Sequence, residues 1–188
     1  MSTTNTGIKA PAQEIGKEAP DFTLEDLNGL SVTLSSELAG KKGGVVVFWS
    51  GVCSHCVRYD DYLNRFAQEH PDFAFFAIAS RQQETREDLR KAARDRHLSF
   101  PILIDPGGLQ ARRWFTQQTP RAFLLAPDRS LLYRGAIDNF QFSGDSDYVA
   151  YLEPAIADFL AGRPVSQPET ASFGCAIESV YYIMPRTL

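Results

Sequence analysis

The sequence predicts one α/β domain in which a mixed β-sheet lies between two layers of helices. Continuous apolar runs at residues 45–50 and 73–80 are typical of strands buried on both faces. Segments with helical spacing follow both runs. Further along, two short apolar runs at 121–125 and 131–134 flank a polar turn and predict an antiparallel pair. Alternating strands and helices that end in a hairpin and a helix imply a mixed sheet sandwiched by helices.

The N-terminal part predicts a β-hairpin. Residues 1–15 are polar and are expected to be flexible. Apolar and polar residues then alternate over 19–34 on both sides of Asn28-Gly29, a strong hairpin signal. A brief helical turn at 35–39 is expected before the central strand at 45–50.

The middle of the chain predicts helices that alternate with strands. After Gly51 the apolar residues Tyr59, Tyr62, Leu63 and Phe66 fall on one side of a helix that begins near residue 53. The remaining elements are expected as follows: a surface helix from about Arg86, a strand at 100–104, a short helix at 109–115 and a final amphipathic helix at 148–160.

Three units are therefore expected: a flexible N-terminus at 1–15, a domain at 16–162, and a C-terminal extension at 163–188 that packs on the domain or on a partner. The extension contains an apolar cluster at 180–184, which is a candidate partner interface. With 188 residues the chain is long enough for one domain with a substantial core.

Composition excludes several classes of function. The formal net charge of −4 gives no electrostatic reason to expect nucleic acid or an anionic membrane as partner. No apolar run approaches the ~20 residues that a bilayer span needs. The first residues lack the pattern of a secretory signal, so we expect a cytoplasmic protein, with a periplasmic protein whose export signal has been removed as the alternative. Three cysteines are too few for a disulfide scaffold.

Cys53 and Cys56 are the strongest candidates for chemistry. They lie where the buried strand ends and the helix begins, and free backbone N–H groups there stabilise a thiolate. We expect Cys53 to attack a target disulfide and Cys56, one turn on, to release the mixed disulfide and close a disulfide with Cys53. Two inert core cysteines are the structural alternative. A zinc site that recruits His55, His70, His97 or Cys175 is less favoured, because no second pair has ligand spacing.

Several short motifs in this order resemble the thioredoxin-like fold, in particular its TlpA-like and alkyl hydroperoxide reductase/thiol-specific antioxidant (redoxin) branch. The motifs are Ala19-Pro20-Asp21-Phe22-Thr23-Leu24, Phe48-Trp49, Phe100-Pro101-Ile102-Leu103-Ile104-Asp105 and Thr119-Pro120. A Cys-x-His-Cys subgroup is similar in Cys53-Ser54-His55-Cys56, Tyr133-Arg134-Gly135-Ala136-Ile137-Asp138 and Phe173-Gly174-Cys175-Ala176-Ile177. The resemblance covers roughly residues 19–178.

The resemblance implies a thiol–disulfide oxidoreductase without metal or organic cofactor, acting on a protein or small-molecule disulfide or dithiol. An imidazolium at His55 would stabilise the thiolate and make the couple more oxidising than that of thioredoxin. Pro120 is expected to follow a cis bond and to face the dithiol, where the Thr119 backbone would pair with an extended substrate strand. Trp49 is a candidate substrate contact that shields the dithiol, or an ordinary core residue.

Other interpretations stay open. A thiol-dependent peroxidase would oxidise Cys53 to a sulfenic acid that Cys56 resolves; Ser50 suits this, whereas Val46 stands where such enzymes place proline. A copper- or other metal-handling protein is the alternative from another class. Cys175 is a third redox cysteine, an intermolecular disulfide or a buried filler, and we favour packing. The charged stretch 81–96 is interpreted as a solvated helix face rather than a docking surface.

Overall fold

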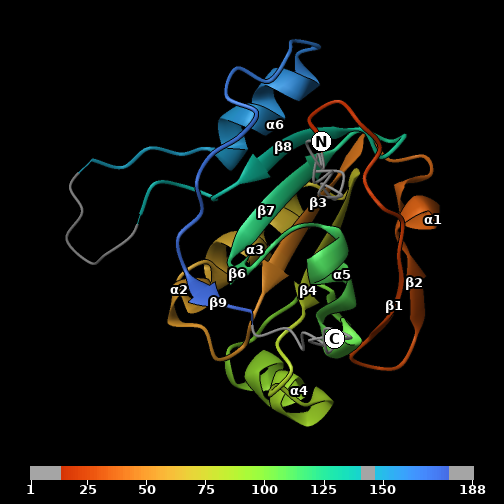
Figure 1. The fold of residues 1–188 in the computed structure, drawn as a ribbon, viewed down its shortest axis with the longest axis vertical. Helices are drawn as coiled ribbons and strands as arrows, with labels where there is room; N and C mark the ends of the chain where they lie inside the picture. Colours follow the sequence, from red (N-terminus) through yellow and green to blue (C-terminus); the bar gives the residue numbers. More distant parts are fainter. Residues whose placement is uncertain (1–13, 141–146, 178–188) are drawn as a thin grey trace, which may run out of the picture.

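The computed structural model describes residues 14–140 and 147–177. It has a seven-stranded sheet, with helices packed against it (Figure 1). In spatial order its strands are β2 (Ser31–Thr33), β1 (Thr23–Asp26), β5 (Ile102–Ile104), β4 (Phe73–Ala79), β3 (Gly43–Trp49), β7 (Arg121–Leu125) and β8 (Leu131–Gly135). A second, two-stranded sheet joins β6 (Gln118–Thr119) to β9 (Cys175–Ala176). The helices are α1 (Leu34–Leu38), α2 (Ser54–Val57), α3 (Asp60–Glu69), α4 (Arg86–Asp95), the 3₁₀ turn η1 (Pro106–Gly108), α5 (Leu109–Arg113) and α6 (Leu152–Leu160).

The large sheet is mixed, as predicted. β3 pairs in parallel with β4, and β4 with β5, whereas β7 runs antiparallel to β3 and β8 runs antiparallel to β7. The predicted N-terminal hairpin is confirmed: β1 and β2 are antiparallel, and β1 extends the sheet by pairing with β5. The central strands are therefore flanked by partners on both sides, which fixes the position of the turn that follows β3.

All seven residues of β3 are buried, because helices cover both faces of the sheet. Alternate residues point to opposite faces: Val45, Val47 and Trp49 pack with side chains of α3, α4 and α6 in one apolar cluster. Val46 and Phe48 pack in a second cluster with α1, α5 and the N-terminal segment. This three-layer arrangement confirms the predicted fold class.

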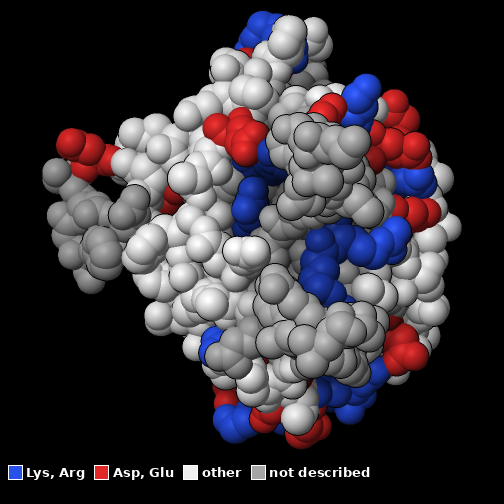
Figure 2. All heavy atoms as spheres, viewed as in Figure 1, with Lys and Arg blue, Asp and Glu red and all other residues white. Residues whose placement is uncertain are grey.

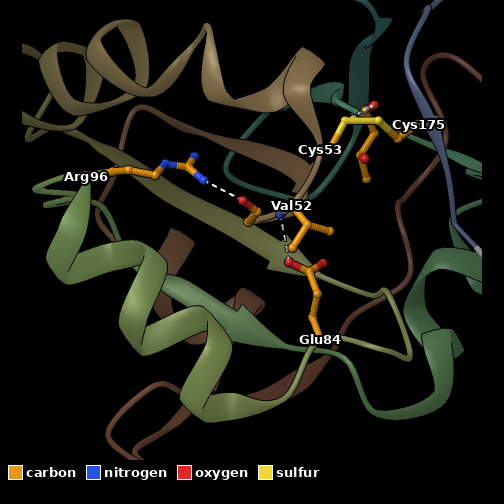
Figure 3. The surroundings of a disulfide bond; sticks show 7 residues. Val52, Cys53, Glu84, Arg96 and Cys175 are labelled. Carbon is orange, nitrogen blue, oxygen red and sulfur yellow. Dashed lines mark hydrogen bonds between the residues drawn. A yellow bond between two sulfur atoms is a disulfide. The ribbon is translucent and has the colours of Figure 1, made fainter.

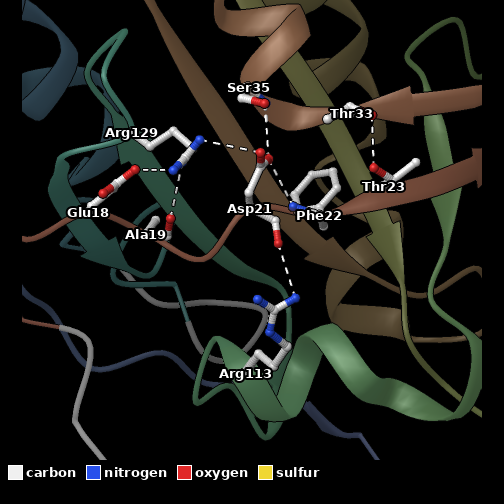
Figure 4. Close-up of polar contacts among 9 residues, drawn as sticks. All are labelled: Glu18, Ala19, Asp21, Phe22, Thr23, Thr33, Ser35, Arg113 and Arg129. Carbon is white, nitrogen blue, oxygen red and sulfur yellow. Dashed lines mark hydrogen bonds and ion pairs between the residues drawn. The ribbon is translucent and has the colours of Figure 1, made fainter.

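A polar network secures the N-terminal segment against the sheet (Figure 4). Asp21 accepts hydrogen bonds from the backbone N–H groups of Phe22 (2.9 Å) and Ser35 (3.1 Å) and pairs with Arg129 (3.3 Å). Burial acts to raise the pKa of Asp21, but the hydrogen bonds from Ser35 and Phe22 and the charge of Arg129 outweigh it, so the pKa lies below its usual value. The ionised carboxylate thus joins the segment before β1 to α1 and to the β7–β8 turn.

The prediction of one helix from residue 53 is wrong in one respect, because the structure has two helices there, α2 and α3. The chain leaves helical geometry at Tyr59 (φ −96°, ψ 2°), between α2 and α3. Tyr59 is buried, and its hydroxyl donates to the Asp138 carboxylate at 2.5 Å, which fixes the chain at the break. The final helix is also shorter than expected and begins at Leu152 rather than at residue 148.

The part of the predicted extension at 163–177 packs on the domain: Val165 lies against the first apolar cluster and β9 pairs with β6. Residues 1–13 and the apolar cluster at 180–184 lie outside the described residues. Within 14–140 and 147–177, no helix combines the length and the apolar character needed to cross a bilayer. Figure 2 shows acidic and basic side chains interspersed over the face in view.

Candidate functional site

The turn after β3 places Cys53 and Cys56 on one short helix. Cys53 is the N-cap of α2, and its carbonyl oxygen accepts from the backbone N–H groups of Cys56 (2.9 Å) and Val57 (3.1 Å). Both cysteine side chains are fully buried, in the same apolar cluster as Trp49. The strand-to-helix placement that the sequence predicted for these two residues is therefore confirmed.

Two charged residues near α4 hold this turn in place (Figure 3). Arg96 donates to the Gly51 carbonyl oxygen at 2.6 Å, and the Glu84 carboxylate accepts from the Val52 N–H at 3.2 Å. Arg96 also binds Asp60 at the start of α3. The interpretation of residues 81–96 as a solvated face missed these contacts, because alternating charges along a helix do not show which of them point inward.

Cys53 is joined by a disulfide to Cys175, and the two Cα atoms are 5.9 Å apart (Figure 3). Cys56 is a free, buried thiol. The expected Cys53–Cys56 disulfide is therefore not the one in this structure. The preference for Cys175 as a packing residue was wrong, since its sulfur bonds to the candidate nucleophile within one chain, 122 residues away.

The peptide bond between Thr119 and Pro120 is cis, as predicted, and it directly follows β6. Thr119 pairs with Cys175 and Gln118 with Ala176 in the antiparallel β6–β9 sheet. The Thr119 carbonyl oxygen lies 3.4 Å from the Cys53 Sγ, a distance at which a reduced Cys53 thiol would donate to it. An extended strand thus occupies the backbone of Thr119, and that strand belongs to the same chain.

Burial raises the pKa of the Cys56 thiol from 9.0 to about 12. A hydrogen bond with the Thr119 side chain and another with the Ser50 backbone act in the opposite direction, but desolvation is the larger effect. At neutral pH Cys56 is therefore protonated in this state. It becomes a nucleophile only when it loses this proton, which contact with water would make easier.

His55 and Trp49 occupy different environments. The His55 ring is partly exposed and lies edge-on to Phe173, with 5.0 Å between the ring centroids. Trp49 has no exposed surface; it packs against Phe100 and lies under the Arg96 guanidinium, 5.1 Å from the ring centroid. This placement favours the core interpretation of Trp49, and its role in substrate binding stays a prediction.

Metal binding and peroxide reduction are the alternatives that the sequence left open. In the part of the chain that the structure describes, no three His, Cys, Asp or Glu side chains are grouped closely enough to hold a metal ion. Cys53 has no exposed surface while it is bonded to Cys175. A peroxide would reach its sulfur only after that bond opens, so the peroxidase interpretation stays a prediction.

A mixed sheet between helices, a Cys-x-x-Cys turn after its central strand and a cis-proline loop beside the cysteines define a thioredoxin-like protein. The family model described as Redoxin matches residues 14–152, and the chain belongs to this family. It is 30% identical over 124 residues to thiol-disulfide oxidoreductase ResA of Bacillus thuringiensis subsp. konkukian. The aligned residues cover 66% of this chain and 70% of that protein.

Solved structures confirm the fold. A hypothetical protein from Sinorhizobium meliloti superposes with a TM-score of 0.81 at 28% identity, covering 89% of this chain and 95% of that one. An uncharacterized conserved protein from Geobacillus kaustophilus gives a TM-score of 0.79 at 26% identity, covering 88% and 92%. Both alignments reach well beyond the 66% of this chain that aligns with ResA.

Proposed function

We propose that this protein is a thiol–disulfide oxidoreductase in which Cys53 exchanges disulfides with a protein or small-molecule partner. One observation supports this most directly: the Cys53 sulfur is already bonded to a cysteine on an extended strand that pairs with Thr119. A mixed disulfide with an external substrate needs the same arrangement of sulfur and backbone. The similarity to ResA, a protein named for this activity, supports the same reaction class.

The residues divide the reaction between them. Cys53 forms the mixed disulfide, and Cys56, one helical turn on, displaces the partner and closes a disulfide with Cys53. Thr119 and Pro120 present backbone to the partner's strand. His55 is next to Cys56 and partly exposed, and as an imidazolium it stabilises the reduced thiolate. We therefore propose a couple more oxidising than that of thioredoxin; a redox titration that places its potential at or below thioredoxin's would contradict this.

Insulin reduction by dithiothreitol tests the reaction class. The purified protein should accelerate insulin precipitation, and Cys53→Ser should abolish the acceleration. Arg94→Ala is a matched control, because Arg94 lies on α4 with 63% of its side chain exposed. Equal acceleration by wild type and Cys53→Ser, or none by wild type, would overturn the proposal. The double variant Cys56→Ser, Cys175→Ser, in which no second cysteine can displace the partner, should in addition retain a cysteine-containing peptide covalently on Cys53.

A further inference from the structure

The segment 168–177, which we call the C-terminal strap, is bound to β8 at one end. Its backbone pairs with Arg134, which donates to the Pro168 carbonyl oxygen (3.0 Å) and accepts from the Thr170 N–H (3.1 Å). The Thr170 hydroxyl lies 2.6 Å from the Tyr133 hydroxyl and accepts from the Ala136 N–H at 3.0 Å. The Tyr133-to-Asp138 motif thus provides the first anchor of the strap.

The other end of the strap is bound to β6. The Gln118 side-chain amide donates to the carbonyl and hydroxyl oxygens of Ser172. The Ile177 N–H donates to the Gln117 carbonyl oxygen at 2.7 Å, and its side chain is buried in the second apolar cluster. Gly174 lies so close to β6 that a Cβ at this position would be 1.9 Å from the Thr119 carbonyl oxygen. Only glycine fits there.

The strap encloses Cys53 and leaves Cys175 more accessible. The Cys53 side chain has no exposed surface, whereas Cys175 is partly exposed. Phe173 of the strap packs edge-on against His55 of α2, two residues from Cys53. While the strap is in place, an external partner can reach neither the Cys53 sulfur nor the Thr119 backbone.

Thr119 lies next to all three cysteines. Its carbonyl oxygen lies 3.4 Å from the Cys53 Sγ, its backbone is the register partner of Cys175, and its side chain is near enough to the Cys56 thiol to lower the pKa of that thiol. Cys175 also packs against the apolar cluster that contains Cys53 and Cys56. All three cysteines thus lie in or against one apolar cluster beside Thr119, and such closeness is a precondition for exchange between two alternative disulfides.

We propose that Cys175 is a third redox residue and that the strap is an internal substrate, which Cys56 releases by disulfide exchange. The Cys56 thiolate attacks the Cys53 sulfur; the Cys53–Cys56 bond forms, the Cys53–Cys175 bond breaks, and Cys175 leaves as a thiolate that takes up the proton lost by Cys56. No external oxidant is consumed. The strap then leaves β6, and its place is open to an external partner. This inference rests on the proposed function, since a partner disulfide supplies the oxidised state.

Disulfide mapping tests the two alternative bonds. The protein is equilibrated in glutathione buffers, and its free thiols are blocked by alkylation. Mass spectrometry of its peptides then identifies which cysteines are bonded. We expect both bonds in wild type, only Cys53–Cys175 in Cys56→Ser, and only Cys53–Cys56 in Cys175→Ser. Cys56→Ala serves as a second variant if the serine disturbs folding. Absence of the Cys53–Cys175 bond from wild type and from both Cys56 variants would overturn the inference.

A rate measurement tests the release of the strap. Cys53 of oxidised Cys175→Ser, which has no bond to the strap, should form a mixed disulfide with glutathione about tenfold or more faster than Cys53 of oxidised Cys56→Ser, because Cys53 is covered in the latter and attack is directed to the partly exposed Cys175. Equal rates would overturn the inference. Insulin reduction separates the two proposals. If Cys175→Ser is active and wild type contains no Cys53–Cys175 bond, only the inference about the strap is refuted. If wild type and Cys175→Ser are both inactive, the proposed function is refuted.

Discussion

Arg96 binds Asp60 through both carboxylate oxygens, with 2.6 Å from Nε to Oδ2 and 2.7 Å from Nη2 to Oδ1. The pair is largely buried, with 20% of the Arg96 side chain and 9% of the Asp60 side chain exposed. Because Arg96 also binds the Gly51 carbonyl oxygen, one guanidinium links the end of α4 to the start of α3 and to the turn that presents Cys53.

We expect Arg96→Ala to lower the free energy of unfolding by about 2–4 kcal/mol, because it leaves a buried carboxylate without its partner. Urea unfolding monitored by circular dichroism measures this. Arg94→Ala removes the same side chain from an exposed pair with Glu87 and should cost about 0.5 kcal/mol or less. Equal losses in the two variants would show that the Arg96 pair does not hold the turn.

The raised pKa of Cys56 predicts a pH dependence of its alkylation. In the form with the Cys53–Cys175 disulfide, Cys56 is the free thiol, and peptide mapping after iodoacetamide treatment measures its alkylation separately from that of Cys175. The rate should still be rising at pH 10 in the folded protein, because burial raises the pKa to about 12, and should level off just above pH 9 after unfolding in guanidinium. A plateau near pH 9 in the folded protein would contradict the burial of this thiol.

The same shift makes a prediction about stability. A thiol whose pKa is higher in the folded than in the unfolded state stabilises the fold fully below pH 9. Its contribution declines as the pH rises from 9 toward about 12, because the unfolded thiol ionises first. Cys56→Ala should remove this part of the alkaline loss of stability, which unfolding curves of oxidised wild type and variant between pH 8 and 11 would show.

Gly174→Ala should displace the strap without touching any cysteine. The new methyl group would meet the Thr119 carbonyl oxygen, which belongs to backbone and cannot move aside cheaply. We expect the fraction of Cys53–Cys175 disulfide at a fixed glutathione ratio to fall several-fold, as measured by peptide mapping. Ala176→Ser changes an exposed residue of the same strap and should leave that fraction unchanged. An unaltered fraction in Gly174→Ala would contradict the close approach.

Asp21→Asn tests the network around the N-terminal segment. Losing the ionised acceptor should lower stability by about 1 kcal/mol at pH 7, a modest figure because Asp21 is partly exposed. Since folding lowers the pKa of Asp21, its contribution is present above pH 3.8 and is lost as the pH falls further, so wild type and variant should converge in acid. Glu37→Gln removes the same charge from an exposed position on α1 and should have little effect.

Most of the fold was predictable because it is built from local patterns. The apolar runs became β3 and β4, the alternation around Asn28-Gly29 became the β1–β2 hairpin, and the charged stretch contained α4. Boundaries were less certain: the break at Tyr59 depends on a hydrogen bond to Asp138, 79 residues away, which no local pattern contains.

The site was predictable only in part. The motif around Cys53 and the cis bond before Pro120 followed from short segments, but the partner of Cys53 did not. β9 is two residues long and has no periodic pattern, so its pairing with β6 is decided entirely by tertiary contacts. A usable signal was present nonetheless: Gly174 directly precedes Cys175, and a glycine before a cysteine suits a backbone that approaches another strand closely.

The melting temperature of the protein should depend on which cysteine is bonded to Cys53. This disulfide joins residues 122 positions apart, so it restricts the unfolded chain far more than a Cys53–Cys56 disulfide would. In the chain-entropy model the difference in the free energy of unfolding is about 3 kcal/mol. Transfer of the bond from Cys175 to Cys56 therefore lowers the stability of the fold in the same step that opens the place of the strap to a partner. We expect the form ready to meet a partner to melt at a lower temperature than the resting form.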